Sequence, residues 1–227
     1  MAMHLDHVSI SSPNLYYGAH RLRLESTLSF YDGGHLLNGD LANRIFPLGS
    51  NTYLELGGIV NAESVRNAND RPWWYDKVQR LGECFTGLCF RVDTLEELQE
   101  IAKKKRYTIA QNPTTRIRPN GYVLRAFPAP SPATTWPKGL PNWYWFEDLP
   151  MHPSGQPPST WPKITRPDGL AWIEVGGTEK AMYDWLDVPV GTFPFKFNGK
   201  RAGLYAIGVK TMKGGEIVIR RPSATEF

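Results

Sequence analysis

The amino-acid sequence predicts an α+β protein made of repeated units, in which a strand leads into a helix and then into further strands. A strand followed by a helix start begins near residues 5, 86 and 169. These intervals of roughly eighty residues are too long and too few for a solenoid. Glycine-containing turns separate short strand patterns after each helix. Duplicated modules with mainly antiparallel sheets, and helices packed outside them, follow from both observations.

The first unit opens with a strand at residues 5–11, where His7 lies on one face and Val8 on the other. Ser12-Pro13 predicts the start of a helix, as an N-cap followed by proline at the first helical position. The helix is expected to end at about residue 28. Its apolar side would cover the face that carries Val8, which leaves His7 on the opposite face.

The unit closes with two strands within residues 41–58, joined by a tight turn at Gly49-Ser50-Asn51. Side chains alternate along the second strand, so Tyr53 and Glu55 share one face while Leu54 lies on the other. A glutamate among apolar residues is costly to bury without a partner. Either this strand faces water on one side, or Glu55 points into a functional cavity.

The later units follow the same order. Residues 86–93 predict a strand, and Thr94 with Glu97 predicts a capping box that begins a helix. The third unit starts with a strand at residues 169–175 and a helix from residue 178 to about 186. Further expected elements are a turn at Asp32-Gly33-Gly34, a loop or short helix over residues 61–82, proline-rich extended loops over residues 127–163, and strands at residues 122–127, 143–147, 193–197, 203–209 and 216–220.

The composition is that of a soluble globular protein, with 41% hydrophobic and 21% charged residues. No apolar run approaches the ~20 residues that span a bilayer, and the first residues lack the pattern of a signal peptide. Two cysteines, Cys84 and Cys89, cannot form a disulfide framework, so a cytoplasmic location is expected. A net charge of +4 without a basic stripe argues against nucleic acid as a partner, and no membrane partner is expected.

Aromatic residues are abundant, with eight Trp, ten Tyr and ten Phe. Two clusters contain many of them, Arg71-Pro72-Trp73-Trp74-Tyr75 and Asn142-Trp143-Tyr144-Trp145-Phe146. They are either ordinary core residues or the lining of a pocket for a flat or hydrophobic ligand. In the second cluster, Trp145 is the ring that we assign to ligand binding.

Two segments together resemble a known family. The start LDHVSIS and the later GGHLLNGDLANRIFPLGSNTYLELGG are similar to the glyoxalase-like branch of the vicinal-oxygen-chelate superfamily, and GLCFRVDTLEEL and RIRPNGYVLRAF support this over about residues 4–150. The resemblance implies two βαβββ modules, at about residues 1–61 and 84–150, paired into a half-open barrel. Residues 1–165 would form this domain, with a C-terminal βαβββ-like unit at residues 166–227 packed on it.

The resemblance also implies a metal site. In metal-binding members the ligands come from the first and last strands of each module, which gives His7 and Glu55 from the first module. The second module then places Cys89 opposite His7 and Glu147 opposite Glu55. A second histidine is missing, which disfavours an extradiol-type iron dioxygenase. The set is compatible with a divalent metal (Zn, Ni, Mn or Fe) or with no metal, and Cys89 is either a zinc ligand or a small buried hydrophobe.

Without a metal, Glu55 would be a buried carboxylate of raised pKa that abstracts a proton next to a carbonyl. The other interpretation is a carboxylate paired with a cation, for which Arg44 or Arg91 could serve. His7 would act as a ligand or an acid, or be a satisfied structural histidine.

Further polar residues are expected to line the pocket. Arg116 and Arg118 share a strand face two residues apart, and either clamp a carboxylate or enol oxygen or lie solvated at a sheet edge. Asn43 would point its amide into the cavity or satisfy a turn, and Tyr53 would bind substrate. His152 receives no role beyond a rim position.

Together with these residues, the resemblance implies a glyoxalase-like enzyme with lyase or isomerase chemistry on a small hydrophobic or aromatic compound. Glu55 and His7 would be its catalytic residues. The alternative is a non-catalytic protein that sequesters a hydrophobic small molecule, and a third hypothesis is a scaffold with a vestigial pocket. A homodimer is a further expectation.

Overall fold

The computed structural model describes residues 3–36, 40–69, 71–109, 112–155 and 166–226. Eight strands form a closed barrel in the order β1-β4-β3-β2-β6-β7-β8-β5. They are β1 (His4–Ser12), β2 (Tyr31–Leu36), β3 (Leu41–Gly49), β4 (Thr52–Ile59), β5 (Cys84–Arg91), β6 (Thr114–Ile117), β7 (Val123–Ala129) and β8 (Asn142–Phe146). The predicted α+β fold with paired βαβββ modules is confirmed.

Each module closes on its own first strand. In the first, β1 and β4 run parallel, with His7 beside Tyr53 and Ser9 beside Glu55. In the second, β5 and β8 run parallel, with Cys89 beside Asn142. The modules meet where β1 pairs antiparallel with β5 and where β2 pairs antiparallel with β6. The second contact closes the barrel that the resemblance describes as half-open.

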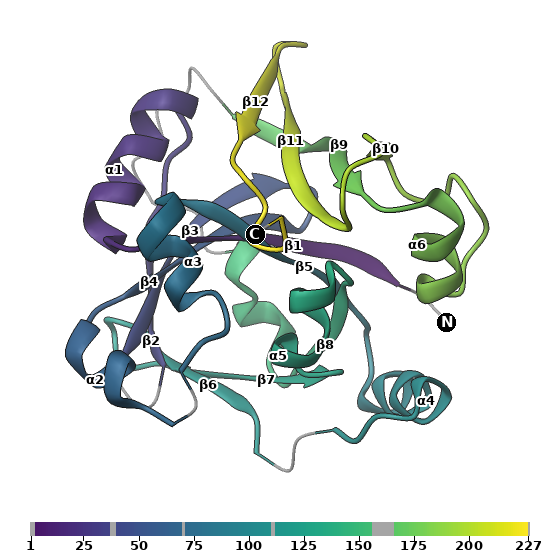
Figure 1. The fold of residues 1–227 in the computed structure, drawn as a ribbon, viewed down its shortest axis with the longest axis horizontal. Coiled ribbons are helices and arrows are strands. Elements are labelled where there is room, and N and C mark those ends of the chain that lie inside the picture. Colours follow the sequence, from purple (N-terminus) through teal and green to yellow (C-terminus); the bar gives the residue numbers. More distant parts are fainter. Residues whose placement is uncertain (1–2, 37–39, 70, 110–111, 156–165, 227) are drawn as a thin grey trace.

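The helices of the two modules, α1 (Leu15–Ser26) and α4 (Leu95–Lys105), lie outside the barrel (Figure 1). In α1 the buried side includes Leu15, Ala19 and Leu22. In α4 the capping box of Thr94 and Glu97 is present in both directions. These apolar stripes cover the outer surface of the strands, so the polar face of β1 and β4 is left for the inside of the barrel.

Two local predictions are wrong. Asn14, not Ser12, caps α1, because the Asn14 side chain accepts the backbone N–H of Tyr17 and leaves Pro13 outside the helix. Asp32-Gly33-Gly34 is part of β2 rather than a turn. The register between β2 and β3 shifts between Asp32 and Gly34, and Gly34 has a φ of +103°. The two glycines therefore form a β-bulge, and the strand continues past them.

The connecting segments contain more helix than expected. Residues 61–82 form α2 (Ala62–Asn67) and α3 (Tyr75–Leu81), with Trp73 and Trp74 just before α3. The proline-rich region, predicted as extended loops, forms short helical turns on either side of β8, and its residues 156–163 lie outside the described residues. Those turns are α5 (Pro132–Thr135), η1 (Trp136–Lys138), η2 (Leu149–Met151) and η3 (Pro153–Gly155).

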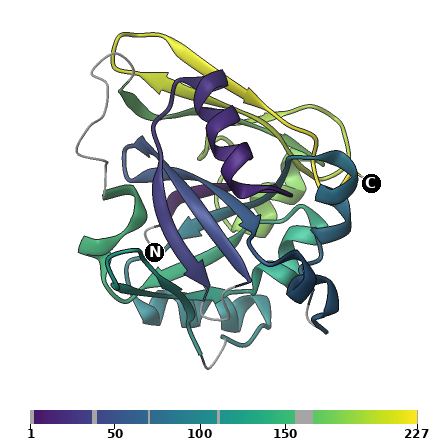
Figure 2. The ribbon, with the colours of Figure 1, turned by 90° about the vertical axis from the view of Figure 1, so that its left-hand side faces the viewer.

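The C-terminal unit has the predicted element order but its own strand order. It consists of β9 (Pro167–Gly176), α6 (Glu179–Leu186), β10 (Phe195–Phe197), β11 (Gly203–Thr211) and β12 (Glu216–Arg220). The sheet order is β10-β9-β11-β12, so the first strand, β9, lies between β10 and β11. In the two barrel modules, by contrast, the first strand lies beside the last one. Figures 1 and 2 show this sheet packed across one side of the barrel. Residues of both sheets share one hydrophobic core cluster.

None of the helices in the described part of the chain is long and apolar enough to cross a membrane.

Candidate active site

A β-bulge in β1 places two neighbouring polar side chains at the start of the site. In the pairing of β1 with β5, Leu5 faces Phe90 and His7 faces Cys89, so Asp6 is the extra residue. Strict alternation would turn Asp6 away from His7. The bulge instead lets Asp6 Oδ2 approach His7 Nδ1 to 2.6 Å, with Asp6 fully buried.

Asp6 binds a second histidine from a distant segment. His152 Nε2 lies 2.8 Å from Asp6 Oδ1, and Arg91 Nε lies 3.6 Å from the same oxygen. Burial by itself would raise the pKa of Asp6, but the charge of His152 and the hydrogen bonds from His152 and His7 lower that pKa well below its ordinary value. Asp6 is therefore an ionised acceptor, and both histidine rings donate to it. His152, expected only at the rim, is 4% exposed and belongs to this network.

His7 turns its second ring nitrogen toward the cavity. Nδ1 faces Asp6, so Nε2 is the ring nitrogen that faces Glu55, and it lies 3.6 Å from Glu55 Oε2. Tyr53 stacks on the imidazole with ring centroids 4.6 Å apart and planes at 19°, which holds the ring in place. The ring is therefore fixed on one side by Asp6 and on its face by Tyr53.

Glu55 is buried among donors. Its Oε1 accepts hydrogen bonds from Asn43 Nδ2 and Arg116 Nη2, each at 2.6 Å, and its Oε2 accepts one from Ser9 Oγ at 3.1 Å. Burial would raise the pKa of Glu55, but the charges of Arg116 and His7 and these hydrogen bonds lower it. The expectation of a raised pKa is therefore wrong.

The cation that neutralises Glu55 is Arg116, which comes from β6 in the other module. The two arginines expected for this role have other partners. Arg44 pairs with Asp32 at 2.8 Å, and Arg91 contacts Asp6 and Asp93. The hypothesis that Glu55 is paired with a cation is thus confirmed, but the cation is Arg116 and not Arg44 or Arg91.

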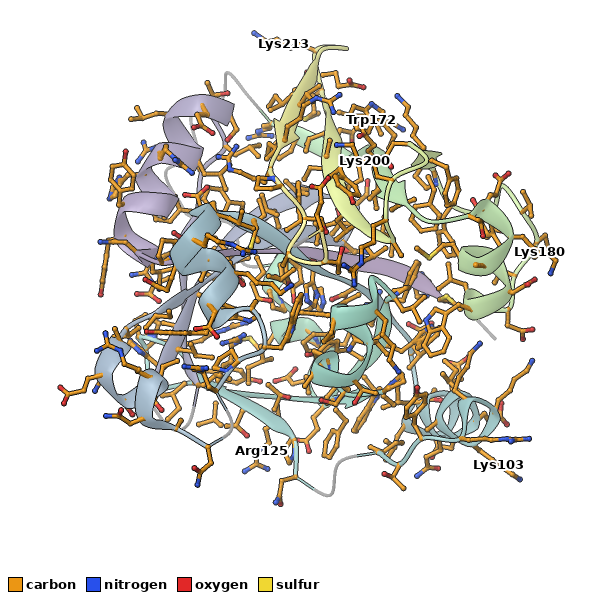
Figure 3. The ribbon with its side chains drawn as sticks, viewed as in Figure 1. Lys103, Arg125, Trp172, Lys180, Lys200 and Lys213 are labelled. Atoms are coloured by element: carbon orange, nitrogen blue, oxygen red, sulfur yellow. The ribbon has the colours of Figure 1, made fainter. Side chains whose placement is uncertain are left out.

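The second module contributes differently from the expectation. Glu147 follows the end of β8 with its side chain 38% exposed, near Arg125, which Figure 3 shows at the edge of the molecule. Cys89 is fully buried, its Sγ donates to Asn142 Oδ1, and burial raises the pKa of the thiol well above its ordinary value. Trp145 packs on the outer side of the barrel against Phe127. None of these three side chains lines the cavity beside Glu55.

Tyr144 occupies the position that corresponds to Glu55. Glu55 lies two residues after Tyr53, the β4 partner of His7, and Tyr144 lies two residues after Asn142, the β8 partner of Cys89. The register of β8 is thus set so that Asn142, Tyr144 and Phe146 face inward. Tyr144 lies in the cavity with its ring centroid 5.7 Å from that of His7.

The inside of the barrel has two adjacent compartments that share part of their lining. A small inner pocket is lined by the predicted residues His7, Asn43, Tyr53, Glu55, Arg116 and Arg118. A larger outer chamber is lined by Trp73, Trp74 and Trp136, among other residues. Glu55, Thr114, Arg116 and Tyr144 line both compartments. The Glu55–Arg116 ion pair therefore lies on the boundary between them.

The side chains of the site do not fit the divalent metal that the resemblance implies. Glu55 is already neutralised by Arg116, its oxygens accept three hydrogen bonds, and the buried Cys89 thiol is held in its protonated form. No three His, Cys, Asp or Glu side chains in the described ranges are grouped so that they could hold a metal ion. The positive charge beside Glu55 and His7 comes from a guanidinium.

A family profile described as glyoxalase-like domain matches residues 5–181. The chain therefore belongs to the glyoxalase-like domain family, within the vicinal-oxygen-chelate superfamily. No curated protein sequence matches it.

Solved structures with a similar fold share little sequence. A hypothetical protein from Staphylococcus aureus is 10% identical with a TM-score of 0.61, over 96% of this chain and 86% of that one. The methylmalonyl-CoA epimerase of Mycobacterium tuberculosis is 15% identical with a TM-score of 0.44, over 65% of this chain and 89% of that one. A hypothetical protein from Bacillus halodurans is 14% identical with a TM-score of 0.44, over 65% and 96%. The first of these supports the fold alone.

The structure adds Asp6, Ser9, His152 and Tyr144 to the residues found from sequence. Asp6 stands directly before His7 in the sequence, and this adjacency is the only local signal for the pair. Strand alternation hides it, because a bulge cannot be read from side-chain pattern alone. His152 lies 146 residues from Asp6, and no spacing rule connects the two.

The buried charge of Asp6 predicts a pH-dependent loss of stability in Asp6→Asn. A depressed carboxyl pKa stabilises the fold fully above the unfolded value of 3.8, and this contribution is lost as pH falls toward the folded value. We expect Asp6→Asn to cost about 3 kcal/mol at neutral pH and less below pH 3.8. Urea unfolding across this pH range measures it. Asp184→Asn, in an exposed ion pair of α6, is the control and should change little. A difference that does not shrink at low pH would contradict the assignment.

The donor set also predicts that the purified protein holds no stoichiometric divalent metal. After incubation with Zn²⁺, Ni²⁺, Mn²⁺ or Fe²⁺ and removal of free ions, elemental analysis should find well below one equivalent of each. The reason is that Arg116 already supplies the positive charge next to Glu55. One equivalent that is lost in Glu55→Gln but kept in Glu147→Gln would show instead that Glu55 ligates a metal.

Proposed function

We propose that this protein is an enzyme that transfers a proton at a carbon atom next to a carbonyl group, in lyase or isomerase chemistry, on a small hydrophobic or aromatic compound. The observation that carries the proposal is the hydrogen bond between Asp6 and His7, which turns His7 Nε2 toward the cavity. Membership of the glyoxalase-like family supports an enzyme-like role but leaves the substrate open.

His7 is the general base in this proposal. Nε2 takes the proton from the carbon, and the electron pair of the C–H bond moves into the carbonyl group to form an enolate. Asp6 is a positioning residue that fixes the tautomer and stabilises the imidazolium from the far side. Glu55, at 3.6 Å, stabilises the same positive charge from the cavity side. Return of the proton to carbon completes an isomerisation, and loss of a leaving group from the neighbouring carbon completes a lyase reaction.

Arg116 is placed to stabilise the enolate oxygen. A guanidinium has five N–H donors, and one of those in Arg116 is given to Glu55. Arg118, 6% exposed and bound to the backbone oxygen of Met151, adds a second guanidinium to the same pocket. Asn43 keeps Glu55 fixed, so Arg116 is oriented without needing substrate. This preorganised positive charge performs the electrostatic part of the reaction.

A second candidate function is sequestration of a hydrophobic small molecule. The observation in its favour is that the second module offers a buried cysteine and a tyrosine where the first offers His7 and Glu55. A ligand bound tightly and recovered unaltered would support this function. Catalytic exchange or conversion of the ligand would exclude it.

Proton abstraction can be measured without knowing the product. Carbonyl compounds with an acidic neighbouring C–H are incubated in D₂O, and loss of the carbon-bound proton is followed by NMR. We expect His7→Gln to lower the exchange rate by about 10²- to 10⁴-fold, because the base is lost. Asp6→Asn should lower it less, and His35→Gln, an exposed histidine of β2, should not change it. Exchange that survives in His7→Gln would remove His7 from the mechanism.

A further inference from the structure

The outer chamber is built to accept a bulky group. Its floor is made of small side chains on β1 and β4, including Ser9, Ser11 and Gly57. Among the residues that the structure describes, a Cβ atom at Gly57 would have two contacts within 4 Å, Ile10 O at 3.8 Å and Ser11 Oγ at 3.9 Å, and neither is tight. A larger residue at position 57 would project into the chamber. Protein cores are close-packed, so the space left open above these small residues is unlike a core and is suited to a ligand.

Aromatic rings from two unrelated segments form the walls. Trp73 and Trp74 precede α3 on one side, and Trp136 follows α5 on the other. Trp136 lies directly over Gly87 of β5, where a Cβ atom would collide with its ring, and its Nε1–H donates to Asn142 Oδ1 at 2.9 Å. The ring is therefore held in a fixed place rather than filling a gap by chance.

Guanidinium groups lie at the inner end of the chamber. The Glu55–Arg116 ion pair lines the chamber there, and Arg118 lies further in, in the inner pocket. Arg71 lines the chamber from the segment before α3, where it pairs with Asp76. Aromatic walls with guanidinium N–H donors at one end suit a molecule with a flat apolar body and an electron-rich oxygen head.

We infer that the outer chamber is a binding site for the planar, apolar body of the ligand, and that the ligand class is aromatic compounds bearing a carbonyl or carboxylate group. The head reaches past Glu55 to Arg116 and Arg118, and the ring system lies between Trp73, Trp74 and Trp136. This inference deepens the proposed function, on which it rests for the chemistry at the head. The division into two compartments separates recognition of the body from reaction at the head.

Binding of 2-naphthoate tests the inference without requiring turnover. Calorimetry should show one site per chain, with affinity at least tenfold above that of acetate, which has no body, and of decahydro-2-naphthoate, which has no planar body. Gly57→Leu fills the chamber and should lower the affinity for 2-naphthoate at least tenfold. Ala133→Leu, on the opposite and exposed wall, is a second variant in case Gly57→Leu does not fold. Val218→Leu, on the exposed face of β12, is the control and should bind as the wild type does.

Several results would overturn the inference. They are no binding of 2-naphthoate at millimolar concentration, equal binding of the planar and saturated acids, or unchanged affinity in both chamber variants. A dimer that Gly57→Leu converts to monomers would also overturn it, because the chamber would then be a subunit interface. If 2-naphthoate binds but no carbonyl compound shows His7-dependent exchange in D₂O, the chamber site is supported and the proposed function is contradicted. If exchange depends on His7 but Gly57→Leu and Ala133→Leu bind 2-naphthoate with unchanged affinity, the proposed function is supported and the chamber site is contradicted.

Discussion

The fully buried carboxylate of Asp6 is the constraint on which the geometry of the cavity depends. A buried anion is tolerated only when it is paired and hydrogen-bonded, and Asp6 meets this need with two histidines and an arginine. The two histidines come from opposite ends of the domain. The same carboxylate therefore orients His7 in the cavity and ties the segment after β8 to β1. A bulge of a single residue makes both contacts geometrically accessible.

The Glu55–Arg116 pair makes the two modules chemically unequal while their strands keep the same pairing. β1 and β4 supply His7 and Glu55, whereas the equivalent positions on β5 and β8 hold Cys89 and Tyr144. The charge that Glu55 needs comes instead from β6 of the second module. A cation built into the chain differs from a bound ion because it is always present and its N–H donors point in fixed directions. The Glu55–Arg116 pair thus lies where the two compartments of the barrel meet.

Much of the fold was predictable because its signals are local. Strand alternation placed Tyr53 and Glu55 on one face, and the capping box at Thr94 marked the start of α4. Errors arose where one residue decides the outcome. The bulge at Asp6 and the register of β8, which turns Glu147 outward and Tyr144 inward, depend on pairing with other strands. The partners of Glu55 and Asp6 are distant in sequence, so composition and spacing could not identify Arg116 or His152.

The orientation of His7 is the central claim, and its ring tautomer can be observed directly. Nitrogen-15 NMR of histidine-labelled protein distinguishes the two ring nitrogens in the neutral imidazole. The predicted spectrum has the proton on Nδ1 and a free Nε2, and Asp6→Asn should shift this balance because the acceptor of the Nδ1 proton is weakened. A neutral ring that carries its proton on Nε2, or one whose tautomer is the same in Asp6→Asn, would contradict the account.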